Sequence, residues 1–513
     1  TGPRAPTIGV VPRRAAACFF AVVLVAGCSG GPDKGASTSA SSTRPRTATT
    51  IPPTAGTSSA STTFAPQPLD FQSCGRNIEC ATLTVPLDYS DPTGPTIDLA
   101  INRAVARDGA HRIGALLVNP GGPGASGLVV VQSELSAFPS EVRDRFDIVG
   151  FDPRGVGKSN EVPCAADDLV AAFRHADATP DTPEEQAELD RLAQTIAADC
   201  ADKAGELLPH VGTDDAVRDI DSIRRALGED TISFAGFSYG TLLGLRYAEL
   251  FPTAARAIML DGVVDPNQGF VDYLREQARA FETQLNTLFA QCPTGGGRCP
   301  DGGAAAAYDE LARRVETNPL PAGSSGTVGP NELATAATEA TYTPSGSTDL
   351  FQALAAGLAG DGTLLDEMFQ SYASSVHFAS YAGVECIDGP HPVGPIAYRA
   401  FAAEVEKVAP RMGGSVANEL LPCAFWPAPV KSVVGPVAAH GAPPILVVGN
   451  THDAATPYEQ AQRVASGLER ATLLTFDSAG HTAFGSGNQC ILDAMTAYLV
   501  DLRLPPEGTI CSP

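Results

Sequence analysis

Residues 231–250 decide the fold, and their sequence is TISFAGFSYGTLLGLRYAEL. Residues 231–235 are β-type and largely apolar, whereas residues 241–250 have helical composition. Between them lies GFSYG, residues 236–240, which matches the nucleophile elbow Gly-x-Ser-x-Gly. In such an elbow the serine occupies a tight turn from strand to helix, where larger neighbouring side chains would clash. This context predicts that Ser238 is a nucleophile at the end of a strand.

Short apolar strands separated by helical segments surround this turn. We expect strands at residues 97–106, 114–119, 146–151, 256–260, 445–448 and 472–476, and a helix over residues 213–227 with Gly228 beyond its end. Apolar strands without alternation, separated by helices, indicate a parallel sheet covered on both faces. Together with the elbow, this pattern predicts an α/β-hydrolase fold with a mostly parallel sheet flanked by helices.

The alternation of strand and helix stops between about residues 267 and 435. This stretch is richer in helical pattern, contains Cys292, Cys299, Cys386 and Cys423, and lies between two expected sheet strands. We therefore expect an inserted, largely helical cap domain at residues 267–435. The hydrolase core then has two parts, residues 70–266 and 436–513. A chain of 513 residues is long enough for two such folded units.

A serine hydroxyl becomes an effective nucleophile when a base accepts its proton and an acid orients that base. On this fold the order along the chain is serine, acid, histidine. Of the histidines after Ser238, His481 alone lies in a turn directly after an expected late strand, in DSAGH at residues 477–481. We predict His481 as the general base.

The acid of the triad has one favoured candidate and two alternatives. Asp453 follows the strand at residues 445–448 and a short turn, which places it at the carboxyl end of a strand, where ligand chemistry gathers in open α/β sheets. Asp261 and Asp265 follow the strand at residues 256–260, and some hydrolases recruit the acid there. We predict Asp453 and keep Asp261 and Asp265 as alternatives.

Negative charge that develops on the substrate oxygen needs preorganised donors. One donor is expected to be the backbone N–H of Tyr239, directly after the nucleophile. The other is expected from the loop PGGPG at residues 120–124, through Gly121 and Gly122, because glycines let backbone N–H groups approach closely. The alternative is that this loop is only a tight turn.

Composition limits the partners. The formal net charge is −24, and a surface this acidic repels phosphate backbones, so we expect no nucleic-acid partner. No cysteine pair has two-residue spacing with histidines nearby, so we expect no metal site. A serine, histidine and aspartate mechanism also requires no organic cofactor.

The amino-terminal segment predicts export. Arg13 and Arg14 precede an apolar run over residues 15–25, and LVAGC at residues 24–28 resembles a bacterial lipobox. We expect a lipoprotein signal peptide at residues 1–27, a lipidated Cys28, and a disordered Ser/Thr/Pro-rich tether at residues 28–69. The enzyme would then be held at the outer face of the cell membrane or in the cell envelope. A plain secretory signal is the alternative, and no other stretch is apolar enough to span a membrane.

The cysteines agree with an oxidising compartment. From Cys74 onward they are even in number and fall into near neighbours, as a disulfide framework would have. Spacing alone does not prove connectivity, but the simplest pairing is Cys74 with Cys80, Cys164 with Cys200, Cys292 with Cys299, Cys386 with Cys423, and Cys490 with Cys511.

Four motifs together resemble one family: NPGGPG at residues 119–124, DPRGVGKS at 152–159, the GFSYG elbow, and DAATPYE at 453–459. They resemble the exported actinobacterial tripeptidyl aminopeptidases, which are relatives of proline iminopeptidase and include mycobacterial cell-envelope serine proteases. The resemblance covers about residues 70–513. In that family the acid lies in an Asp-Pro-x-Thr-Pro run, and here Ala454 replaces the first proline. Thr456 matches the motif threonine, which can support the acid loop by a hydrogen bond or serve as an ordinary helix N-cap.

The resemblance implies an α/β-hydrolase with a helical cap that cleaves short peptides from free N-termini. Recognition of an ammonium requires acidic groups facing the cleft. The segment YAGVECID at residues 381–388 is similar to the family's cap-to-cleft segment, so Glu385 and Asp388 are the candidates. Two alternatives remain: a carboxylesterase or lipase with the same triad, and a non-catalytic binding protein on a hydrolase scaffold.

Overall fold

A ten-stranded sheet forms the base of the molecule in the computed structural model, which describes residues 64–294, 298–323, 326–431 and 433–513. Its strands, in spatial order, are β1 (Gln72–Gly75), β2 (Ile78–Pro86), β3 (Thr96–Ala104), β5 (Phe146–Phe151), β4 (Gly114–Asn119), β6 (Ile232–Phe237), β7 (Ala255–Asp261), β10 (Ile445–His452), β11 (Ala471–Ala479) and β12 (Ile510–Cys511). β1, β2 and β3 are antiparallel, and all pairs from β5 to β12 are parallel. The expected mostly parallel sheet is confirmed.

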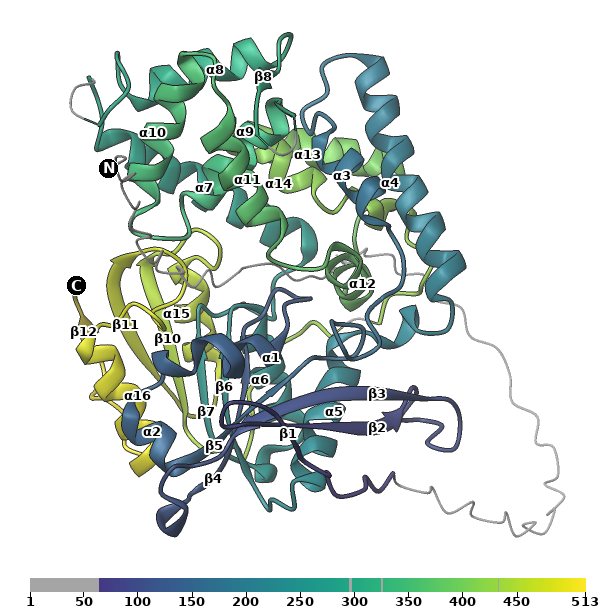
Figure 1. Ribbon diagram of the computed structural model, residues 1–513, viewed down its shortest axis with the longest axis vertical. Helices are drawn as coiled ribbons and strands as arrows, with labels where there is room; N and C mark the ends of the chain where they lie inside the picture. The colour runs from purple at the N-terminus through teal and green to yellow at the C-terminus, as the bar shows by residue number, and fades with distance from the viewer. Residues whose placement is uncertain (1–63, 295–297, 324–325, 432) are drawn as a thin grey trace, which may run out of the picture.

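Helices cover both faces of this sheet (Figure 1). On one face, α2 (Ser140–Arg145) packs against β5 and α16 (Gln489–Asp501) packs against β7. The two helices also contact each other and bury residues such as Val142 and Met495. On the other face lie α5 (Thr213–Ala226), α6 (Tyr239–Leu250) and α15 (Tyr458–Gly467), whose apolar residues join the larger core. The central strands β4, β5 and β6 are buried along their whole length, because side chains on both of their faces contact helices.

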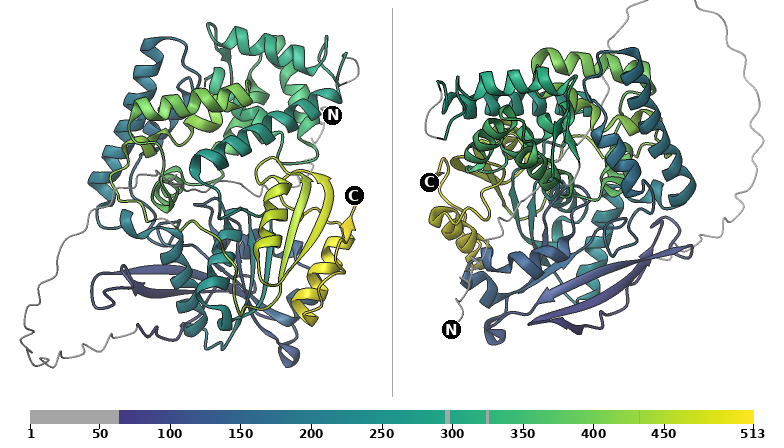
Figure 2. Two further views of the ribbon diagram at one scale, coloured as in Figure 1. Left: turned by 180° about the vertical axis from the view of Figure 1, so that it is seen from behind. Right: turned by 45° about the horizontal axis from the view of Figure 1, so that its top comes forward.

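A helical cap lies beyond the carboxyl ends of the parallel strands (Figures 1 and 2). Its helices between β7 and β10 are α7 (Phe270–Ala290), α8 (Ala304–Val315), α9 (Pro330–Glu339), α10 (Gly346–Leu358), α11 (Thr363–Ala373), α12 (Phe378–Asp388), α13 (Pro395–Val408) and α14 (Gly413–Asn418). A short two-stranded pair, β8 (Leu320–Pro321) and β9 (Thr327–Val328), lies among them.

The cap also contains two helices from the first part of the chain, which the sequence had assigned to the core. These are α3 (Asp167–His175) and α4 (Pro183–Ala204), which stand beside α9 and α13 in Figure 1. Asn331 of α9 donates to the carbonyl of Arg174 at 2.6 Å, and Asn418 donates to the carbonyl of Ala178 at 2.8 Å. The cap is therefore built from two separate stretches, because the apolar face of α4 packs against η6 (Leu421–Phe425) and not on the sheet.

Five disulfides join the cysteines from Cys74 onward, and the pairs are the five expected neighbours. Cys164–Cys200 fixes the start of the α3–α4 excursion, and Cys386–Cys423 joins α12 to η6. Within the described part of the chain no helix is both long enough and apolar enough to cross a membrane. The expected signal peptide, Cys28 and nearly all of the tether lie outside the described residues.

Candidate active site

The nucleophile elbow has the strained geometry that the sequence predicts. Ser238 lies between β6 and α6 with φ 55° and ψ −128°, a positive φ that is rare for a residue with a side chain. A Cβ atom on Gly236 would lie 2.2 Å from the carbonyl oxygen of Gly240, and one on Gly240 would lie 2.5 Å from that of Asn119. Both flanking positions therefore require glycine. The turn presents Ser238 at the amino end of α6, where the helix dipole favours negative charge.

Asp453 and His481 form a buried pair. His481 Nδ1 lies 2.9 Å from Asp453 Oδ2 and 3.0 Å from Oδ1, and their side chains are 1% and 0% exposed. The Asp453 carboxylate also accepts from the backbone N–H groups of Ala455 and Thr456, each at 2.9 Å, and from the Thr456 hydroxyl at 3.0 Å. Thr456 thus has the supporting position expected for it. The carboxylate is fixed in place to orient the imidazole through Nδ1.

The two alternative acids have other partners. The carboxylate of Asp261 accepts from the backbone N–H groups of Ala483 and Phe484, at 3.0 and 2.8 Å, and burial raises its pKa to about 6. Asp265 pairs with Arg463 at 2.6 Å. Neither carboxylate orients the His481 ring, so the geometry favours Asp453 as the acid.

The end of β7 lies between the nucleophile and the base. The N–H of Ser238 donates to the carbonyl of Asp261 at 3.0 Å. A Cβ on the next residue, Gly262, would lie 3.0 Å from His481 Cε1 and 3.2 Å from Thr456 Oγ1. Within the described residues, Ser238 Oγ and His481 Nε2 are both buried and lack a hydrogen-bond partner. These are the two atoms between which a triad transfers its proton, and in free enzymes that contact often tightens only when substrate binds.

The glycine loop after β4 packs against the elbow. A Cβ on Gly121 would lie 2.9 Å from the backbone nitrogen of Tyr239 and 3.0 Å from Ser238 Cβ. The N–H of Gly121, however, donates to Asn119 Oδ1 at 2.9 Å. Because the Gly121 N–H already donates to Asn119, the expectation that Gly121 donates to the oxyanion is corrected. The N–H groups of Gly122 and Tyr239 remain as the candidate oxyanion donors. The sequence analysis missed Asn119, although an asparagine that ends a strand before a glycine loop is a usable signal.

Asp388 and Glu385, the two acids expected to bind a substrate ammonium, differ in their hydrogen-bond partners. Asp388 is fully buried, and its oxygens accept from the N–H of Thr213 at 2.9 Å and from the Thr213 hydroxyl at 2.5 Å. The Thr213 hydroxyl also contacts Tyr239 Oη at 2.6 Å, so Asp388 anchors the start of α5 beside the elbow. This occupancy argues against Asp388 as a substrate ligand. The sequence could not predict this role, because the partner of Asp388 is Thr213, which lies 175 residues away in the chain.

Glu385 is also fully buried, but neither of its carboxylate oxygens has a hydrogen-bond partner among the described residues. Burial, followed by the charges of Asp388 and Glu419, raises its pKa well above the usual value. Its charge in turn helps burial to raise the pKa of Tyr239, beside the nucleophile, and that of Tyr273, whose hydroxyl donates to the acid loop at Ala455. Glu385 lies three residues before Asp388 on α12, the helix that contacts Thr213 beside Tyr239 of the elbow.

Comparison with known proteins places this site in a family. The family described as TAP-like protein matches residues 409–511. The serine protease Hip1 of Mycobacterium bovis is 35% identical over 459 residues, which cover 84% of this chain and 87% of that protein. The tripeptidyl aminopeptidase of Streptomyces lividans is 32% identical over 468 residues, which cover 87% of each. The chain belongs to the TAP-like α/β-hydrolase family.

Relatives in this family carry different activity names. A Mycobacterium tuberculosis protein named Carboxylesterase B is 35% identical over 459 residues, which cover 85% of this chain and 87% of that protein. Family membership thus establishes a serine hydrolase, as the buried Asp453–His481 pair and the strained elbow of Ser238 also indicate. The choice between amide and ester substrates depends on the surroundings of the triad.

Proposed function

We propose that this enzyme is an exported aminopeptidase that releases short peptides, of the tripeptidyl type, from free N-termini. The observation that carries the proposal is the Glu385 carboxylate, which is buried three residues before Asp388 on α12 and has no hydrogen-bond partner for either oxygen among the described residues. A buried carboxylate without a partner is costly, and a substrate ammonium would offset that cost by pairing with it. A neutral ester offers no such compensation.

The triad then works through an acyl-enzyme. Ser238 Oγ attacks the carbonyl carbon of the scissile amide while His481 Nε2 takes its proton, and Asp453 stabilises the imidazolium through Nδ1–H. The N–H groups of Tyr239 and Gly122 hold the oxyanion. The C–N bond breaks as His481 returns the proton to the leaving amine. A water molecule, deprotonated by His481, then releases the acyl peptide and restores Ser238.

The test compares three substrates that share a reporter: a tripeptidyl p-nitroanilide with a free amine, the same compound N-acetylated, and p-nitrophenyl acetate. We expect the free-amine peptide to be cleaved with the highest kcat/KM. Glu385→Gln should raise KM for the free-amine peptide and leave p-nitrophenyl acetate turnover nearly unchanged. Faster cleavage of the acetylated peptide by the unaltered enzyme would reject an aminopeptidase.

A carboxylesterase is the second candidate, because a relative with that name is 35% identical and the same triad cleaves esters. In that case esters of medium-length acids would be turned over faster than any peptide in the same assay, and Glu385→Gln would not discriminate between free and acetylated amines.

We also propose that the protein is exported and anchored through a lipid on Cys28. The lipobox sequence supports this, and five disulfides are characteristic of oxidising compartments. Cys28→Ala should release the protein from the membrane fraction of the producing cells. If the variant stays in that fraction to the same extent, the anchor is wrong.

A further inference from the structure

A groove opens between the cap and the core beside the catalytic base. Its cap wall is formed by residues 342–345, between α9 and α10, and its core wall by residues 478–489, from the end of β11 to the start of α16. His481 is buried at its inner end, whereas Ser345 and Ser486 are exposed at its outer end. The groove has a volume of about 760 Å³, which is within the usual range of ligand-binding sites.

The cap wall of this groove is attached to the turn that carries the base. The N–H of His481 donates to the carbonyl of Tyr342 at 2.9 Å, and the two rings are nearly perpendicular with centroids 5.6 Å apart. A Cβ on Gly480 would lie 3.0 Å from that carbonyl oxygen and 3.1 Å from Pro344 Cδ. These contacts fix the position of the groove relative to the triad.

The oxyanion loop is covered by a different part of the cap. A Cβ on Gly122 would lie 3.1 Å from Val376 Cγ1, in the segment before α12. A Cβ on Gly124 would lie 3.1 Å from the backbone nitrogen of Tyr381, on α12 itself. In a triad the oxyanion donors hold the carbonyl oxygen, whereas the base gives its proton to the leaving amine. The leaving part of a substrate therefore departs past His481, where the groove lies.

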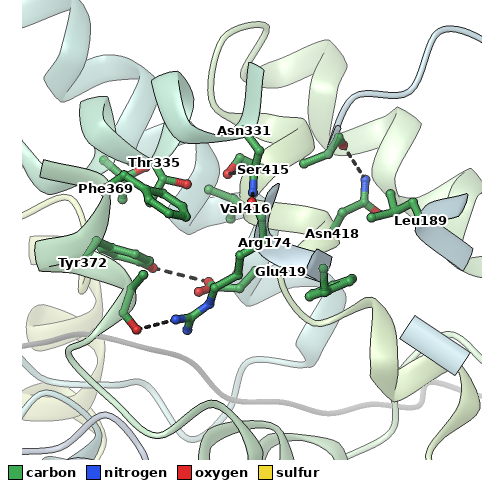
Figure 3. A pocket seen from close by; sticks show the side chains of 14 residues that line it. Arg174, Leu189, Asn331, Thr335, Phe369, Tyr372, Ser415, Val416, Asn418 and Glu419 are labelled. Atoms are coloured by element: carbon green, nitrogen blue, oxygen red, sulfur yellow. Dashed lines mark hydrogen bonds between the residues drawn. The ribbon is translucent and has the colours of Figure 1, made fainter. Parts of the chain in front are cut away.

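A second pocket, inside the cap, is too small for this part of the substrate. Arg174, Tyr372 and Glu419 are among the residues that line it (Figure 3). Its volume of about 40 Å³ holds a few water molecules. Among the described residues, its lining includes none of the triad and none of the loop that carries the base. Size and position both favour the groove beside His481.

Carboxylates line the outward course of the groove. Glu339, at the end of α9, lines it, and Glu339 and Ser345 also line an adjoining hollow of about 320 Å³ between α10 and α11. Asp349 and Glu367, both exposed, line that hollow. Neither the groove nor the hollow is lined by a lysine or arginine among the described residues. A segment that follows this course outward therefore meets negative charge.

We propose that this groove binds the leaving side of a peptide substrate, as an extended segment with neutral or basic side chains. The inference rests on the proposed peptidase function, because only amide cleavage releases a peptide amine. It adds a side-chain preference on the side of the scissile bond that departs with this amine. An acidic side chain there would meet like charge from Glu339, Asp349 and Glu367, which disfavours it.

The test uses the groove in the reverse direction, since a site that holds a leaving amine also holds an attacking one. p-Nitrophenyl acetate acetylates Ser238, and a dipeptide amide with a free amine is added as the acceptor. The amine nitrogen attacks the acetyl carbon while His481 Nε2 takes the amine proton, and the C–Oγ bond breaks as that proton passes to Ser238 Oγ. The products are N-acetylated acceptor and free Ser238, and competing hydrolysis gives acetate.

The measured quantity is the N-acetylated acceptor formed per acetate, by mass spectrometry, with Ser238→Ala as the blank for uncatalysed transfer. We expect this ratio to saturate as the concentration of Ala-Lys amide or Ala-Gln amide rises, because the acceptor occupies a site. Ala-Lys amide should be used about 5-fold better than Ala-Glu amide at low salt, and high salt should reduce this factor by screening the exposed charges.

Two variants alter the groove independently. Ser345→Trp fills its outer end from the cap side and should lower the ratio for Ala-Gln amide on the order of 10-fold. Asp349→Asn removes an exposed charge on α10 and should reduce the preference for Lys over Glu by about 2-fold. Ser466→Trp, at an exposed position on α15 outside the groove and the hollow, is the matched control and should behave as wild type.

A ratio that rises linearly with acceptor concentration, equally for Lys and Glu acceptors, would overturn the groove as a binding site. If Ser345→Trp fails to fold and forms no acetate, the acceptor series with wild type and Asp349→Asn still decides. The acetyl donor carries no amino terminus, so this result is independent of the aminopeptidase proposal. Saturation with a preference for Lys would support the groove even if the comparison of free and acetylated peptides rejected an aminopeptidase.

Discussion

Substitution of Asp388 by asparagine separates a structural role from a substrate-binding role. Asp388 is fully buried against Thr213, and burial raises its pKa from 3.8 to about 7. In the unfolded chain the carboxyl group loses its proton near pH 3.8, whereas the folded protein keeps it to about pH 7. The folded state therefore binds more protons in this interval. The contribution of the Asp388 carboxyl group to the free energy of unfolding is therefore largest below pH 4 and falls as the pH rises toward 7.

The size of the effect follows from these two pKa values. Between pH 5 and pH 8 the difference in proton binding lowers the free energy of unfolding of the wild type by roughly 3 kcal/mol. Asparagine has the same shape and no titration. Its amide oxygen can accept from the Thr213 N–H, and its amide nitrogen can donate to the Thr213 hydroxyl. The free energy of unfolding of Asp388→Asn should therefore rise by roughly 3 kcal/mol relative to wild type on going from pH 5 to pH 8.

Urea denaturation of both proteins at pH 5 and pH 8, with a constant m-value, measures this gain. Asp493→Asn, an exposed position on α16, is the control and should show no such relative gain. A difference between Asp388→Asn and wild type that stays the same at both pH values would refute the linkage argument. A selective rise in KM for free-amine peptides would show that Asp388 binds substrate after all.

The remaining predictions concern the catalytic centre and the cap. Ser238→Ala and His481→Ala should each lower kcat on the order of 10³-fold or more in a folded protein, and Asp453→Asn should cost a similar factor through the wrong imidazole tautomer. Asp261→Asn should lower the free energy of unfolding by about 2 kcal/mol with most activity kept, because it disturbs two backbone N–H contacts outside the triad. If Asp453→Asn kept its activity and Asp261→Asn lost it, Asp261 would be the acid of the triad. Replacing both cysteines of Cys386–Cys423, which are 37 residues apart, should cost about 4 kcal/mol of stability in urea, and no change would deny that this bridge constrains the cap.

The sequence predicted the features that local signals encode. Ser238, Asp453 and His481 each follow a strand end in a turn of small residues, and the structure places them at the ends of β6, β10 and β11. The expected strands were recovered because parallel strands buried on both faces are continuous apolar runs. The neighbouring cysteines paired as expected because each pair lies within one local excursion of the chain.

Features that depend on distant contacts were not predictable in the same way. The amphipathic pattern of α4 predicts a buried face but does not say which layer buries it, so its place in the cap was missed. Glu385 and Asp388 are acids three residues apart on the same helix, yet only Asp388 contacts Thr213. The hydrogen bond from the Gly121 N–H to Asn119 Oδ1 depends on the side-chain rotamer of Asn119, which no sequence pattern specifies.

The two-part construction of the cap limits how this family can be engineered and how it can diverge. Asn331 and Asn418 donate to backbone carbonyls of the α3–α4 excursion. That excursion precedes Ser238 in the sequence, whereas the helices that carry the two asparagines follow it. A chimera that exchanges only the later stretch would leave these amides facing a foreign surface. A transplantable specificity module must therefore carry both stretches together, and recombination at a single crossover point would separate them.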